Sequence, residues 1–173
     1  MMLFSAIMLV VGLQTQEYME LAKNRTNVWH MNPGITICGN SGVSMVRATK
    51  AIKYWEKLGY KFDYIRIDHQ INCHTPRYGE IIITLPDQQF NFSDHLASTR
   101  ITISNKTKEI VKARIQIFPK SAQKERVLEH EIGHALGWPH INQPYHMMNP
   151  VWHSGGHNSS GLRLKLFYKN YIK

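Results

Sequence analysis

The sequence predicts a mixed α/β (α+β) fold in which five strands and three helices form one domain. Two observations carry this prediction. Apolar residues recur at helical spacing over residues 45–58, and shorter segments before and after them alternate as strands do. The chain has 173 residues, of which 43% are hydrophobic and 19% are charged. This length and composition suit one globular domain with a core and are unlike a disordered segment.

The first part of the chain predicts a strand, a helix and a second strand. A short strand is expected at 35–37, and a second one at 62–67. The helix over 45–58 can be capped by Ser41 or Ser44. Two strands joined by a helix usually run parallel and often lie side by side in one sheet.

The second part of the chain adds three strands and two helices. The apolar run at 79–85 indicates a strand buried on both faces, as in the middle of a sheet. Residues 99–104 and 109–118 flank a polar turn and predict a hairpin. A helix is expected from Ser121, which can cap it, to about Leu136, and a short C-terminal helix over 162–172.

The charge of the chain is strongly positive, with a formal net charge of +9 and a pI of about 9.6. A basic protein attracts acidic partners, including nucleic acid, but net charge alone locates no site. Lysines and arginines are spread along the chain without a dense block. We therefore expect a solvated basic surface and no specific nucleic-acid partner.

The N-terminal segment, residues 1–33, is expected to precede the folded domain, residues 34–173. Residues 3–11 are apolar apart from Ser5 and are too short to span a bilayer, so no transmembrane helix is expected. Their length fits the apolar region of a signal peptide, although no basic residue comes before Lys23. The alternative is a short helix packed on the domain. The segment favours secretion or export over the cytoplasm.

The stretch around residue 130 has the spacing of a zinc site. His130 and His134 are four residues apart, which places them roughly 40° apart around a helix and one turn apart along it. Gly137 is suited to end this helix, and the chain can then return His140 to the same ion. Three protein ligands leave a fourth position open, as in catalytic rather than structural zinc sites. Glu131 is placed to act as general base on a water there.

Histidines with this spacing are also common without a metal, on surfaces and in cores. The full pattern His-Glu-x-x-His-x-x-Gly-x-x-His, followed by Met148, is much more specific, because each fixed position has a mechanical reason. The seven remaining histidines have no ligand spacing and are expected to be surface or hydrogen-bonded residues: His30, His69, His74, His95, His146, His153 and His157.

On these residues the chain resembles the metzincin metalloendopeptidases, and among them the matrixins. The segment 148–152, Met-Asn-Pro-Val-Trp, is similar to the matrixin Met-Tyr-Pro-x-Tyr segment, and Pro144 also lies at a matrixin position. Ile141 departs from the family, which usually has Ser or Thr there. The resemblance extends weakly over residues 34–173.

The resemblance implies a zincin-like fold with a twisted, mostly parallel five-stranded sheet and an antiparallel edge strand. It implies that Met148 lies beneath the zinc ion and that Pro150 to Trp152 line a primed-side pocket. Substrate is expected to pair with the edge strand of the predicted hairpin, beside Thr99, Ile101 and Ile103. One catalytic Zn²⁺ is expected. The loop 86–98 lacks the family's ligand pattern, so structural zinc and calcium are not expected.

Two cysteines, Cys38 and Cys73, follow the first and second predicted strands. If these strands are parallel neighbours, both cysteines lie at one edge of the sheet, within reach of a disulfide. The alternatives are two free thiols in a reducing compartment, or a zinc-blocking thiol at Cys38. The sequence favours the disulfide, because Cys38 closes a predicted strand and lacks the motif of a blocking switch.

The function expected from the sequence is that of a zinc-dependent endopeptidase, acting as a monomer on proteins or peptides. His130, His134 and His140 are expected to bind the metal, and Glu131 to be the general base. One alternative is a non-catalytic zinc or nucleic-acid-binding domain, suggested by the charge. Another is a peptidase specialised for cell-wall peptides, which the sequence does not distinguish from a general one.

Overall fold

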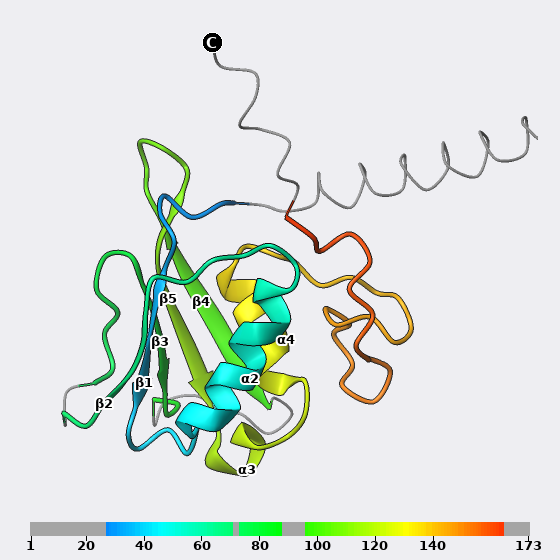
Figure 1. Ribbon diagram of the computed structural model, residues 1–173, viewed down its shortest axis with the longest axis horizontal. Helices are drawn as coiled ribbons and strands as arrows, with labels where there is room; N and C mark the ends of the chain where they lie inside the picture. The colour runs from blue at the N-terminus through cyan, green and yellow to red at the C-terminus, as the bar shows by residue number, and fades with distance from the viewer. Residues whose placement is uncertain (1–26, 71–72, 88–95, 165–173) are drawn as a thin grey trace, which may run out of the picture.

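A computed structural model of the chain describes residues 27–70, 73–87 and 96–164 (Figure 1). Five strands and three helices are found there. In chain order they are β1 (Gly34–Cys38), α2 (Met45–Glu56), β2 (Ile65–Asp68), β3 (Glu80–Thr84), β4 (Ala97–Ile103), β5 (Ile110–Ile117), α3 (Pro119–Ala122) and α4 (Val127–Ala135).

The strands form a single mixed sheet in the order β2-β1-β3-β5-β4. The four strands β2, β1, β3 and β5 are parallel, and β4 pairs with β5 antiparallel at one edge. The predicted mostly parallel sheet with an antiparallel edge strand is thus confirmed. The apolar strand β3 is buried along its whole length in the middle of the sheet, as its composition predicts.

Helices α2 and α4 contact each other and cover one face of the sheet (Figure 1). The side chains of β3 pack on both faces of the sheet, because successive side chains of a strand point to opposite faces. Ile81 and Ile83 belong to the main core together with Trp55 of α2 and Ile132 of α4. Ile82 points to the other face, where it packs with the cysteine pair.

The predicted start of α2 at Met45 holds, but the helix ends at Glu56 rather than at Leu58, and other boundaries also need correction. Ser44 caps α2, since its side chain accepts a hydrogen bond from the backbone N–H of Arg47. The second strand, predicted at 62–67, is β2 at Ile65–Asp68, because pairing with β1 only starts at Ile35 and Ile65. This edge strand is only half-buried, so its apolar pattern is a weak guide to its ends.

The single helix predicted from Ser121 to Leu136 is wrong at its N-terminal end. The structure has a separate short helix α3, then a break, then α4. The break ends at Arg126, whose backbone is left-handed with φ of 67°, so it cannot continue a right-handed helix. Ser121 is buried in α3 and caps neither helix.

Both ends of the described chain pack on the domain. Trp29 forms a bridge with Ile110 of β5, and its indole N–H donates to the carbonyl of Ala135 at 2.8 Å. Residues 162–164 are not helical, and the rest of the helix predicted at 162–172 lies outside the described residues. Within the described chain, no helix combines the length and apolarity that crossing a bilayer requires.

Candidate active site

Helix α4 places His130 and His134 one turn apart, with a ligand atom of each imidazole close to the other. Their Nε2 atoms are 3.0 Å apart. Each Nδ1 lies 2.8 Å from a backbone carbonyl oxygen, that of Met147 for His130 and that of Trp138 for His134. Both carbonyls lie in the segment that follows α4, so this segment fixes the orientation of both rings.

The chain leaves α4 at Gly137, whose φ of 94° is left-handed. A β-carbon at this position would collide with the carbonyl oxygen of Asn27, so both the backbone angle and the space call for glycine. The turn returns His140 to the other two histidines, with ring centroids 5.3 Å from His130 and 4.6 Å from His134. One ligand atom from each of the three histidines lies within 4.8 Å of the others.

The hydrogen bonds of the histidines make this site suitable for a metal cation. A carbonyl oxygen only accepts, so the proton of each neutral ring is on Nδ1 and the lone pair is on Nε2. Two lone pairs facing each other at 3.0 Å repel unless a cation lies near both. Zn²⁺ with three imidazole ligands, two of them held through Nδ1 by a backbone carbonyl, fits this donor set.

Burial keeps the rings neutral. It is the main cause that lowers the pKa of His130 to about 3, with a further contribution from the nearby His134. Burial likewise lowers the pKa of His134 to about 4, and it lowers the pKa of the more exposed His140. Neutral imidazoles are the form that binds zinc, so no proton has to leave at neutral pH.

Glu131 lies beside the histidines with its carboxylate largely buried, at 7% exposure. Burial raises the pKa of Glu131 to about 7, and a hydrogen bond from Thr99 opposes this rise. The Thr99 hydroxyl lies 2.6 Å from Oε2 of Glu131. A carboxyl group with a pKa near neutrality can both take up and release a proton, which suits a general base and acid.

Met148 is fully buried, with its sulfur against Gly133 of α4. A β-carbon on Gly133 of α4 would overlap with its sulfur, so this glycine, at a variable position of the motif, makes room for the methionine. The neighbouring His146 is also fully buried, and its Nδ1 accepts from the backbone N–H of Met148 at 3.0 Å. Its Nε2 then carries the proton and donates to the carbonyl of Ser160 at 3.0 Å.

His146 thus supports the methionine turn, a role that the sequence analysis did not assign. The spacing of His146 from the other histidines gave no indication of this role, because His146 forms hydrogen bonds with backbone groups rather than binding a metal. Its place two residues before Met148 was the one available hint.

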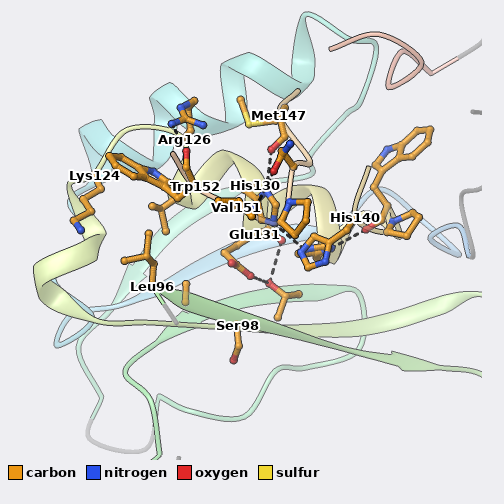
Figure 2. Close-up of a pocket in the computed structure, with 18 of the residues that line it drawn as sticks. Leu96, Ser98, Lys124, Arg126, His130, Glu131, His140, Met147, Val151 and Trp152 are labelled. Atoms are coloured by element: carbon orange, nitrogen blue, oxygen red, sulfur yellow. Dashed lines mark hydrogen bonds between the residues drawn. The ribbon is translucent and has the colours of Figure 1, made fainter. Parts of the chain in front are cut away.

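An open cleft of about 930 Å³ runs beside the histidines, between β4 and the segment that follows them (Figure 2). Four of the five residues predicted to contact substrate line it, namely Thr99, Ile101, Pro150 and Trp152. Ile103 is not among its described lining residues. The side chain of Thr99 is directed to Glu131.

The histidine triad is the one cluster of potential metal ligands found within residues 27–70, 73–87 and 96–164. Most of the loop 86–98, residues 88–95, lies outside the described residues. The expectation that structural zinc and calcium are absent therefore stays a prediction.

The mixed sheet, the helix with two histidines and its adjacent glutamate, and the cleft along the edge strand define a zinc metallopeptidase domain. A comparison with protein families specifies the class, because the family model for matrixin, peptidase family M10, matches residues 45–165. The chain belongs to the matrixin family, and the resemblance noted in the sequence is confirmed. No curated protein shows significant similarity to the chain.

Proposed function

We propose that this protein is a zinc-dependent endopeptidase that cleaves extended polypeptides bound along β4. The observation that carries the proposal is the convergence of three neutral imidazoles at the floor of an open cleft, with a buried glutamate beside them. Bound Zn²⁺ would supply a Lewis acid that polarises the scissile carbonyl and acidifies a water.

His130, His134 and His140 would hold the metal, with Met148 packed beneath them. The carbonyls of Met147 and Trp138 hold the two helical rings in the required tautomer. The open side of the site faces the cleft, where a peptide can enter.

Glu131 would act as the proton carrier. In its ionised form, its carboxylate takes a proton from the attacking water and then donates that proton to the leaving amine nitrogen. Thr99 orients the carboxylate through the 2.6 Å hydrogen bond to Oε2, so it acts as a positioning residue. The burial that raises the pKa of Glu131 also makes it a stronger base than an exposed carboxylate.

The edge strand β4 offers backbone groups to a substrate. It pairs with β5 on one side only, so its other side can add an extended peptide as a further strand. Ile101 and Trp152 line the cleft on opposite sides of such a peptide.

The decisive variant is Glu131→Gln, which keeps the shape of the side chain but removes its basicity. With equal zinc content, cleavage of an unfolded protein should fall by about 10²- to 10⁴-fold, the usual contribution of a general base. Glu56→Gln, at an exposed position at the end of α2, is the matched control and should leave cleavage unchanged. A Glu131→Gln protein as active as the original would refute the assigned mechanism. Zinc binding without any cleavage by the original protein would instead support a non-catalytic zinc domain.

A further inference from the structure

One end of the cleft is built from two cations and an indole (Figure 2). The Nζ atom of Lys124 lies 5.4 Å from the ring centroid of Trp152, and the Cζ atom of Arg126 lies 5.2 Å from it. All three side chains line the cleft. Attraction between a cation and the face of an indole holds each charged group near the ring. We call these three residues the basic end of the cleft.

The basic end is held in place by backbone contacts. The indole N–H of Trp152 donates to the carbonyl of Glu125 at 3.1 Å, and Nη2 of Arg126 donates to the carbonyl of Trp152 at 2.8 Å. The left-handed backbone of Arg126, which interrupts the helix, lies at the same place. A strained non-glycine residue next to a site is a frequent mark of function.

No described carboxylate neutralises this end. Among the residues that the structure describes, neither Lys124 nor Arg126 takes part in an ion pair. Glu131 is the one carboxylate among the described lining residues, and it lies beside Thr99, further along β4. A lysine has three N–H donors and an arginine five, so donors remain for a ligand.

The direction of a bound peptide decides which of its residues meets the basic end. Leu96, which directly precedes β4, lies at the same end of the cleft as Lys124 and Trp152 (Figure 2). A peptide paired antiparallel to β4, the more common arrangement of strands, runs toward Leu96 as it passes Glu131. Its residues after the scissile bond then reach the basic end.

We propose that the basic end binds an acidic side chain, Asp or Glu, on the C-terminal side of the scissile bond. This inference rests on the proposed endopeptidase function and names its substrate class. The substrate carboxylate accepts charge-assisted hydrogen bonds from Lys124 and Arg126, and its methylene groups pack against Trp152 and Leu96. Because the indole already positions both cations, little side-chain freedom is lost on binding.

The test uses quenched fluorescent peptides of one sequence that differ only after the scissile bond, where they carry Glu, Gln or Lys. The zinc-loaded protein should cleave the Glu peptide with a kcat/KM about 5- to 10-fold above that of the Gln peptide, a modest factor because Lys124 is exposed. In Lys124→Met this ratio should fall toward one, and Lys124→Glu should shift preference to the Lys peptide.

Lys120→Met is the matched control. Its Nζ also lies over an aromatic ring, 5.5 Å from the centroid of Phe118, but it does not line the cleft. The control removes the same charge and should leave the ratio unchanged. An equal loss of preference in Lys120→Met would mean that only net charge matters and would overturn the proposed subsite. Equal cleavage of the Glu and Gln peptides by the original protein would also overturn it.

A binding measurement separates this inference from the proposed function. A zinc-loaded Glu131→Ala protein should bind the Glu peptide with a Kd at least about 3-fold below that for the Gln peptide. If no peptide is cleaved but this difference is present, the subsite stands and the proposed function fails. If peptides are cleaved but both bind equally, the function stands and the subsite is refuted.

Discussion

The hydroxyl of Thr99 holds the carboxylate on which the proposed mechanism depends. Removing it in Thr99→Val leaves the shape of the side chain nearly unchanged and should lower kcat about 10-fold, since hydrogen bonds to charged groups contribute ~1.5–3 kcal/mol. KM should change little, because the lost contact is to Glu131 and not to substrate. Thr99→Ser restores the hydroxyl and should recover most of kcat. A Thr99→Val protein with unchanged kcat would show that Glu131 is positioned by other groups.

The pH profile follows from the buried state of Glu131. Burial raises the pKa of its carboxyl to about 7, and the base must be ionised to accept a proton. Activity should therefore fall as the pH is lowered and Glu131 becomes protonated, at a pH below 7 because the positive charge of bound zinc favours the carboxylate. The measurement is kcat/KM for one neutral peptide from pH 5 to 9 at fixed zinc. A profile that stays flat down to pH 5 would contradict the role of Glu131 as base.

Among single residues, the sequence identified those whose spacing carries the chemistry and missed those whose role depends on tertiary contacts. The three histidines and Glu131 come together as expected, because helical periodicity and Gly137 largely determine their places. Thr99 was expected to contact substrate, but its hydroxyl binds a glutamate that is 32 residues away. No local pattern reports such a contact.

At the scale of elements, α2 fixes the position of α4 through a buried ion pair. Nη1 and Nη2 of Arg47 lie 2.8 and 2.6 Å from the two carboxylate oxygens of Glu129, the residue directly before His130. The indole of Trp55 donates to the carbonyl of Glu129 at 2.8 Å. Two contacts from α2 therefore hold the turn of α4 that carries the first metal ligand.

Breaking this pair should destabilise the fold strongly. Arg47→Met leaves the Glu129 carboxylate buried without a partner, which should lower the free energy of unfolding by about 3–5 kcal/mol. Replacing both partners, Arg47→Met with Glu129→Met, should recover much of this loss because no charge stays buried. Urea unfolding measures both variants, with Lys53→Met as an exposed control on α2. A loss below about 1 kcal/mol for Arg47→Met would contradict the structural role of the pair.

Helices and strands were predicted correctly where the pattern of apolar residues spans the whole element. The prediction failed where a single backbone angle determines the end of a helix. The apolar strand β3 and the hairpin of β4 and β5 were recognised from local pattern alone. The break before α4 was missed because Arg126 is an ordinary residue for a helix. Its left-handed backbone coincides with contacts to Trp152, which is 26 residues further along the chain.

At the scale of the whole molecule, Cys38 and Cys73 form a disulfide with Cα atoms 5.5 Å apart. β1 and β2 run parallel as neighbours, which brings Cys38 at the end of β1 and the residues after β2 to one edge of the sheet. We propose from this pair and the apolar N-terminal stretch that the protein is exported to an oxidising environment.

The disulfide should stabilise the domain because it lowers the conformational entropy of the unfolded chain. Its ends are 35 residues apart, for which loop-closure entropy gives about 4 kcal/mol. The double variant Cys38→Ser, Cys73→Ser should show this loss in urea unfolding, and non-reducing peptide mapping should find the bridge in the original protein. Two free thiols in protein taken from its native compartment would count against both the bridge and export.

The most direct test of the central claim is the relation between zinc content and peptide cleavage. The protein is stripped with a chelator, zinc is returned in steps, and bound metal and cleavage of an unfolded protein are measured on the same samples. We predict no cleavage without metal, and activity that rises in proportion to zinc up to one ion per chain, bound by His130, His134 and His140. Cleavage by demonstrably metal-free protein, or full occupancy by zinc with no cleavage, would contradict the assignment of a catalytic zinc site.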